Sequence, residues 1–120
     1  LGIDFTARDL QVKCKSNGHP WEIAKSFDQS ALVGEHFYDV SSIKDLNFSL
    51  LKNGETVQKG NANEMVFNID QIISYISKFI TLKIGDLIFT GTPSGVGSVK
   101  IGDNLEGFIN EERVFSLNIK

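Results

Sequence analysis

The alternation of hydrophobic and polar positions along the chain predicts two substantial helices, the first of them near the start. Thr6 has an acidic residue, Asp9, three positions later, which is the arrangement of a helix N-cap. The helix is therefore expected to begin at Ala7, and Gly18, just past Asn17, is a natural left-handed stop. Three residues at helical spacing would face the core: Ala7, Leu10 and Cys14.

A second helix is predicted after Asn68, because Gln71 follows three residues later in the manner of a capping box. Six apolar residues then fall on one face of this helix: Ile69, Ile72, Ile73, Ile76, Phe79 and Ile80. We expect this face to pack on a sheet. The stripe is fully explained by packing, and we assign it no chemistry.

The middle of the chain carries the pattern of a β-hairpin. Apolar residues alternate at Leu46, Phe48 and Leu50 before Asn53-Gly54, and Thr56-Val57 returns the chain. An Asn-Gly pair between alternating segments is typical of a type I′ turn. A polar loop over residues 61–64 follows, and Val66-Phe67 would prolong the sheet.

The last third of the chain predicts a turn and further short strands. Residues 83–86 form the turn, and Leu87-Ile88-Phe89 is expected to be a buried strand that delivers Thr90 at its end. Two closing strands are predicted over residues 104–109 and 113–119. Short strands with only two main helices favour a mainly β (α+β) domain with mixed sheets. No linker, repeat or low-complexity tract divides residues 1–120, so one domain is expected.

The glycine-rich segment of residues 91–97 does not fit a nucleotide-binding loop. A phosphate-binding loop ends in Gly-Lys-Ser/Thr and leads into a helix, whereas Ser98-Val99 here leads toward another turn. The dinucleotide-binding pattern fails as well, because Lys100 stands where its last glycine would be. What remains is a tight loop whose hydroxyl groups and amides can approach a ligand closely.

Composition excludes several classes of partner. The chain has 12 basic and 15 acidic residues and no basic run, so we expect no nucleic-acid partner. Its apolar runs are far shorter than a membrane span, so no membrane association is expected. A lone cysteine, Cys14, fits a small buried hydrophobic residue in a reducing compartment such as the cytoplasm.

Candidate chemistry gathers around the first helix. Arg8 and Gln11 are three residues apart and share one helix face, and the carboxylate of Asp4 lies just ahead of them. On spacing alone, an ordinary solvated helix start explains these residues better. Lys25 is by its sequence setting either a surface lysine or a cation beside a ligand carboxylate. The two histidines are too far apart in the sequence to suggest a zinc site.

Three separate motifs change this balance. Residues 3–11 (IDFTARDLQ), 20–28 (PWEIAKSFD) and 90–97 (TGTPSGVG) resemble the fumarylacetoacetate hydrolase family, and most of all its acylpyruvate hydrolase and oxaloacetate decarboxylase-like branch. The similarity runs in order through the whole chain. It implies the mixed β-sandwich roll of the family's C-terminal domain, with two main helices, usually in a homodimer. It also implies a Glu-x-Glu pair in a segment upstream of Leu1, since the chain itself contains no such pair.

The resemblance gives the candidate residues specific roles. It implies that Lys25 is catalytic and faces the substrate, and that Arg8, Gln11 and Thr90 also bind the substrate. Asp4 would be a ligand of Mg²⁺ or Mn²⁺, because oxygen ligands without clustered histidines or thiols suit these ions. The general base and the remaining metal ligands are expected upstream of Leu1.

The function implied by the resemblance is a Mg²⁺-dependent hydrolase that cleaves a carbon–carbon bond in acylpyruvate-type 2-oxo acids. It would act in the cytoplasm, or in the mitochondrial matrix of a eukaryote. An oxaloacetate decarboxylase or a 2-hydroxy-diene-dioate isomerase on the same scaffold is the alternative. A third alternative, from a different class, is a non-catalytic binding or assembly domain that retains the fold.

Overall fold

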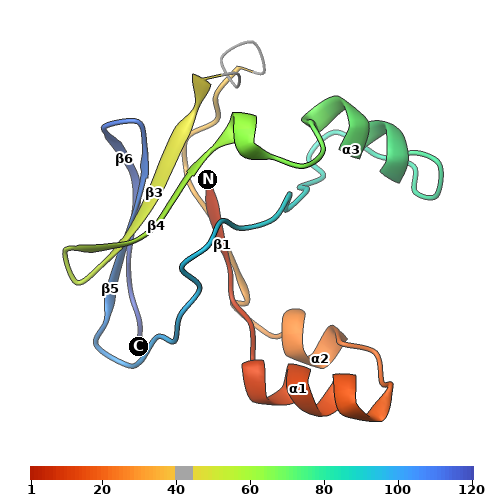
Figure 1. Ribbon diagram of the computed structural model, residues 1–120, viewed down its shortest axis with the longest axis horizontal. Coiled ribbons are helices and arrows are strands. Elements are labelled where there is room, and N and C mark those ends of the chain that lie inside the picture. The colour runs from red at the N-terminus through yellow and green to blue at the C-terminus, as the bar shows by residue number, and fades with distance from the viewer. Residues whose placement is uncertain (40–44) are drawn as a thin grey trace. The chain divides into compact units, whose positions relative to one another are not determined.

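The computed structural model describes residues 1–39 and 45–120. The chain divides into two compact units, residues 1–34 and 35–120, and each has its own antiparallel sheet (Figure 1). In chain order the elements are β1 (Gly2–Asp4), α1 (Arg8–Asn17), α2 (Glu22–Lys25), β2 (Ala31–Val33), β3 (Asn47–Lys52), β4 (Glu55–Asn61), the 3₁₀ helix η2 (Ala62–Glu64), α3 (Ile69–Ile76), β5 (Asn104–Ile109) and β6 (Glu112–Asn118). The predicted fold class, mainly β with a few helices, is confirmed.

The first unit consists of a two-stranded sheet and two helices. β1 pairs with β2, and Ile3 lies opposite Leu32. The core of the unit contains Cys14 of α1 and Ala24 of α2, which are 3% and 0% exposed. The predicted burial of Cys14 is thus confirmed, and a residue as small as Ala24 lets the two helices approach closely.

The start of α1 differs from the prediction. The helix begins at Arg8 with Ala7 at the N-cap position, and no side chain caps it in the described structure. Thr6, predicted as the cap, instead accepts a hydrogen bond from the ammonium group of Lys25. A hydrogen bond to a charged donor is stronger than one to a backbone amide, which favours this arrangement. The predicted left-handed stop is confirmed, because Gly18 has φ 65°.

The second unit is built on a four-stranded antiparallel sheet with the order β4-β3-β5-β6 (Figure 1). The predicted β3–β4 hairpin is confirmed: Asn53 and Gly54 both have positive φ, as a type I′ turn requires. The closing strands are also confirmed within one residue at each end. Burial alternates along β5, so Leu105 and Ile109 form the core together with Val114 of β6.

Two phenylalanine rings lie over glycines of neighbouring strands. Phe48 is opposite Gly60, and Phe115 is opposite Gly107. A Cβ atom at Gly60 would lie 2.5 Å from the ring of Phe48, so only glycine leaves room for the ring. These cross-strand pairs help to fix the register of the sheet.

The third helix forms as predicted at its start but not at its apolar face. Asn68 and Gln71 make the reciprocal hydrogen bonds of a capping box. The helix ends at Ile76, and none of its described residues is buried. Phe79 and Ile80, counted in the stripe, are 72% and 60% exposed. The expectation that this face packs on the sheet is therefore wrong for the described chain, because an apolar stripe specifies a buried face but not its partner.

Three smaller predictions also fail. Val66 and Phe67 form no strand and are 88% and 61% exposed. Residues 87–89 form no strand either, because apolar residues become a strand only beside a neighbour that accepts their backbone hydrogen bonds. The polar segment after Asn61 is the 3₁₀ helix η2, in which the amide of Asn63 donates to the side chain of Asn61 at the N-cap position. In the part of the chain that the structure describes, no helix has both the length and the apolar character to cross a bilayer.

Candidate functional site

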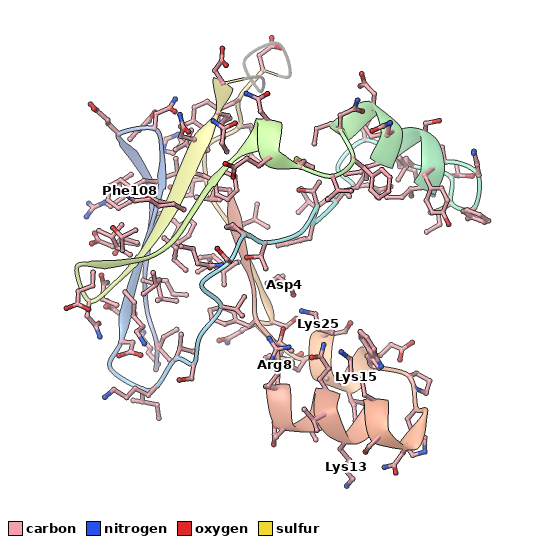
Figure 2. The ribbon with its side chains drawn as sticks, in the orientation of Figure 1. Asp4, Arg8, Lys13, Lys15, Lys25 and Phe108 are labelled. Atoms are coloured by element: carbon pink, nitrogen blue, oxygen red, sulfur yellow. The ribbon has the colours of Figure 1, made fainter. Side chains whose placement is uncertain are left out.

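An ion pair between Asp4 and Lys25 lies at the corner where β1 leads into α1 (Figure 2). The ammonium nitrogen of Lys25 is 2.6 Å from Oδ1 of Asp4. The two side chains are 29% and 47% exposed, so the pair is accessible to a ligand while partly shielded from water. Asp4 is the last residue of β1 and Lys25 the last of α2.

Backbone hydrogen bonds explain why these residues meet across 21 positions of sequence. The amide of Ala7 donates to the carbonyl of Ala24, which joins the chain just after Thr6 to the residue before Lys25. The amide of Phe5 donates to the carbonyl of Ser30, so the segment after α2 runs back along β1. The last residue of α2 is thereby held beside the last residue of β1.

Thr6 is the second partner of Lys25. Its hydroxyl oxygen accepts a hydrogen bond from the ammonium at 2.8 Å, in a partly buried position. An ammonium group has three donors. Asp4 and Thr6 take two of them, and the third has no partner among residues 1–39 and 45–120. Lys25 therefore presents one fixed donor that a ligand can use.

Arg8 and Gln11 lie on one face of α1, as their spacing predicted. A guanidinium nitrogen of Arg8 donates to the side-chain carbonyl of Gln11 at 2.6 Å. Gln11 is only 8% exposed, whereas Arg8 is exposed. The buried amide thus holds one branch of the guanidinium and leaves its other donors available for an anion.

The structure thus places four of the five predicted site residues in the first unit, around one corner: Asp4, Arg8, Gln11 and Lys25. Thr6 is a fifth polar group that the sequence reasoning assigned to a different task. Its position two residues after Asp4 was the available signal, because residues two apart along an extended chain face the same side.

Thr90, the remaining predicted residue, is in the second unit, at the start of the glycine-rich loop. The side chain of Gln58 on β4 donates to the hydroxyl of Thr92 at 2.9 Å and to the carbonyl of Pro93 at 3.0 Å. Gly95 has φ 99° and approaches the backbone carbonyl of Val57 so closely that a Cβ would collide with it. The loop is therefore tied to β4, while the substrate contact of Thr90 stays a prediction.

The metal-binding capacity of the corner rests on one carboxylate. The described residues contain no group of three or more histidine, cysteine or acidic side chains that could hold a metal ion. Oδ1 of Asp4 is used by Lys25, and its other carboxylate oxygen remains for coordination. Mg²⁺ is commonly held by one or two carboxylates together with water and substrate oxygens, so Asp4 fits the part of a single ligand.

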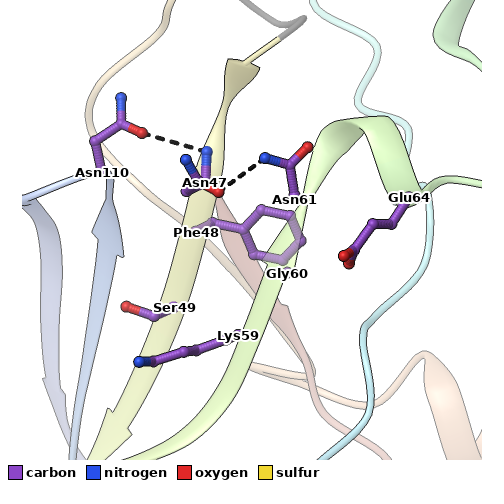
Figure 3. A pocket seen from close by; sticks show the side chains of 8 residues that line it. All are labelled: Asn47, Phe48, Ser49, Lys59, Gly60, Asn61, Glu64 and Asn110. Atoms are coloured by element: carbon purple, nitrogen blue, oxygen red, sulfur yellow. Dashed lines mark hydrogen bonds between the residues drawn. The ribbon is translucent and has the colours of Figure 1, made fainter.

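A separate polar hollow of about 420 Å³ lies over β3 and β4 in the second unit (Figure 3). It contains none of the predicted site residues. Its lining consists of Asn47, Phe48, Ser49, Lys59, Gly60, Asn61, Glu64 and Asn110. The side-chain amide of Asn61 donates to that of Asn47 at 2.8 Å, and the backbone amide of Asn47 donates to the side chain of Asn110 at 3.3 Å. These bonds indicate a structural role for the three asparagines.

The family is shown by the sequence itself. The sequence profile described as "Fumarylacetoacetate (FAA) hydrolase C-terminal" matches residues 1–119. The chain therefore belongs to the fumarylacetoacetate hydrolase family, as the three motifs predicted.

Known members of the family are similar over nearly the whole chain. The chain is 50% identical over 113 residues to the mitochondrial oxaloacetate tautomerase FAHD1 of Rattus norvegicus. The aligned residues cover 92% of this chain and 51% of the relative. A family protein from Yersinia pestis CO92 has a TM-score of 0.91 and 40% identity, covering 99% of this chain and 57% of that one. The fumarylpyruvate hydrolase of Pseudomonas aeruginosa, solved with Mn²⁺ and pyruvate, has a TM-score of 0.89 and 38% identity, covering 98% and 52%. The chain spans about half the length of the curated relatives it matches.

Proposed function

We propose that the corner formed by Asp4, Arg8, Gln11 and Lys25 is part of the active site of a divalent-metal-dependent enzyme that acts on 2-oxo acids. The observation that carries the proposal is the Lys25 ammonium, held at 2.6 Å from Asp4 with one donor left over. The substrate proposed first is oxaloacetate, and the reaction is its keto–enol tautomerisation. The name of the relative that is 50% identical supports this choice.

The residues of this chain would bind and orient the substrate. A 2-oxo acid carries a carboxylate and an adjacent keto oxygen, both of which accept hydrogen bonds. The unused donors of Arg8 and the third donor of Lys25 would bind these oxygens, and the positive charges would stabilise the negative charge that develops when the keto group enolises. The substrate contact of Thr90 is proposed from the family resemblance alone.

A hard divalent cation fits this corner. With Asp4 as one ligand, Mg²⁺ or Mn²⁺ would supply the positive charge that polarises the keto group. The Mn²⁺ and pyruvate in the Pseudomonas aeruginosa structure support such a cation and a 2-oxo acid ligand.

Hydrolysis of acylpyruvates is the second candidate, favoured by the likeness to a fumarylpyruvate hydrolase. Water would add to the distal carbonyl carbon, the adjacent carbon–carbon bond would break, and its electron pair would leave with the pyruvate part as an enolate. Protonation of that enolate gives pyruvate beside a carboxylic acid. Tautomerisation passes through the enolate of oxaloacetate itself, whereas hydrolysis of an acylpyruvate and decarboxylation of oxaloacetate give the enolate of pyruvate. All three reactions therefore need an enolate to be stabilised beside the same 2-oxo acid group.

One set of assays on the full-length protein separates these reactions. Enol oxaloacetate, oxaloacetate and acetylpyruvate are each supplied with Mg²⁺, and the rates of ketonisation, carbon dioxide release and acid release are measured. Fast ketonisation alone is the expected result, with Lys25→Met as the impaired comparison. Faster acetylpyruvate cleavage would replace the first candidate with the second. No acceleration of any reaction would favour a non-catalytic binding or assembly domain.

Assembly and location are part of the proposal. We expect a homodimer, which light scattering of the purified full-length protein tests directly; a monomeric mass would refute it. The mitochondrial name of the rat relative supports a matrix location if the source is a eukaryote, and a cytoplasmic one otherwise. In a eukaryotic source, cell fractionation distinguishes a matrix protein from a cytoplasmic one.

A further inference from the structure

The Lys25 ammonium has two anchors of different chemistry. Asp4 is a charged acceptor at 2.6 Å, and Thr6 is a neutral acceptor at 2.8 Å. Both belong to the same short segment at the end of β1, so both anchors move with the same backbone. A lysine has a flexible four-carbon stem, and one acceptor alone fixes its ammonium poorly.

The two anchors respond differently to a bound cation. A divalent ion at Asp4 would share the carboxylate with Lys25 and would repel the ammonium, so the charged anchor weakens when the ion binds. The hydroxyl of Thr6 carries no net charge. Its hydrogen bond to Lys25 would therefore remain and would keep the ammonium at the edge of the site.

We propose that Thr6 is a positioning residue that holds the Lys25 ammonium toward a 2-oxo acid when a divalent ion occupies Asp4. This inference rests on the proposed function and adds a named residue to it. Thr6 acts through Lys25 and does not touch the substrate itself.

The local structure separates this role from helix capping. α1 begins without a side-chain cap, and Thr6 lies one residue before its N-cap position. Removal of the hydroxyl therefore deprives the helix of no capping bond. Valine keeps the approximate size and the β-branched shape of threonine, and it replaces the hydroxyl that accepts from Lys25 with a methyl group.

The test measures binding in the full-length protein and its Thr6→Val, Thr6→Ser, Lys25→Met and Thr6→Val/Lys25→Met variants. Calorimetry gives the Kd of Mn²⁺ alone and the Kd of pyruvate at saturating Mn²⁺, and thermal unfolding checks the fold. Thr6→Val is expected to weaken pyruvate binding about tenfold, the effect of one lost hydrogen bond to a charged group, with Mn²⁺ binding within about twofold of the parent. Thr6→Ser restores tight binding, and Thr6→Val adds nothing in the Lys25→Met background.

Each other outcome has a definite meaning. Unchanged pyruvate binding in Thr6→Val overturns this inference alone. An equal loss in the Lys25→Met background also overturns it, because Thr6 would then act independently of Lys25. If Thr6→Val fails to fold, Thr6→Ala replaces it and the same comparisons apply. A parent protein that binds neither Mn²⁺ nor pyruvate overturns the proposed function, and this inference falls with it.

Discussion

Oδ1 of Asp4 accepts a hydrogen bond from the ammonium of Lys25 at 2.6 Å, between residues that are 21 positions apart in the sequence. Each charge satisfies the other while a ligand is absent. Because the carboxylate keeps one further oxygen and the ammonium one further donor, the pair can serve a cation and an anion at the same time.

Replacing either cation of the corner should reduce turnover without unfolding the protein. Arg8→Ala and Lys25→Ala in the full-length enzyme are each expected to lower kcat/KM for a 2-oxo acid by about ten- to a hundredfold, since a hydrogen bond to a charged group contributes about 1.5–3 kcal/mol. The matched control is Lys13→Ala, an exposed cation on α1 (Figure 2). Kinetics equal to the parent in both variants, with intact circular dichroism, would refute the proposed substrate contacts.

Activity should require a hard divalent cation. Chelator is expected to abolish turnover, and Mg²⁺ or Mn²⁺ to restore it, because Asp4 offers a carboxylate oxygen. Asp4→Asn should prevent this rescue. Zinc-only rescue, or turnover that survives exhaustive chelation, would show that the oxygen-ligand site is wrong.

The glycine-rich loop should be sensitive to a methyl group at Gly95 and tolerant of one at Gly97. Gly95 has φ 99° and no room for a Cβ against the carbonyl of Val57, whereas nothing lies within 4 Å of a Cβ at Gly97. Gly95→Ala is expected to lower the free energy of unfolding by about 1–3 kcal/mol through backbone strain, measured by urea denaturation. Similar stabilities of Gly95→Ala and Gly97→Ala would contradict the observed loop anchoring.

Protonation of Asp103 should make the second unit less stable in acid. Its carboxylate accepts hydrogen bonds from the side chain of Asn53 and from the amide of Lys100, and these hold its pKa below the ordinary value. A depressed pKa adds stability that is present above the unfolded value of about 3.9 and is lost as the pH falls through the folded value. The melting temperature should fall accordingly on acidification.

The Asp103→Asn variant checks the origin of this pH dependence. We expect it to be less stable than the parent at neutral pH and to show a shallower decline below pH about 4, where the parent loses the same contribution. Asp28→Asn is the matched control, since Asp28 is exposed. If all three proteins decline in parallel, the acid sensitivity has another source.

The sequence correctly predicted several structural features that depend on neighbours along the chain. The left-handed stop at Gly18, the Asn53-Gly54 turn and the capping box between Asn68 and Gln71 all formed as expected. Arg8 and Gln11 also lie on one helix face, as predicted. In each case the geometry of one turn fixes the spacing, so the residue types alone were sufficient.

The sequence failed where the outcome depends on a partner far along the chain. The apolar face of α3 and the apolar residues 87–89 have the composition of buried elements, yet none of these residues is buried in the described structure. Hydrophobic character favours burial, but the chain must bring a second surface or strand alongside before burial occurs.

The candidate site shows both cases at one corner. Sequence alone determined that Arg8 and Gln11 would lie together, since they are three residues apart on one helix. Only the tertiary structure decided that Lys25 meets Asp4 and that Thr6 serves Lys25 instead of capping α1. The physical reason is that this contact needs a chain reversal between α1 and α2, fixed by backbone hydrogen bonds from Ala7 to Ala24 and from Phe5 to Ser30, which no local pattern encodes.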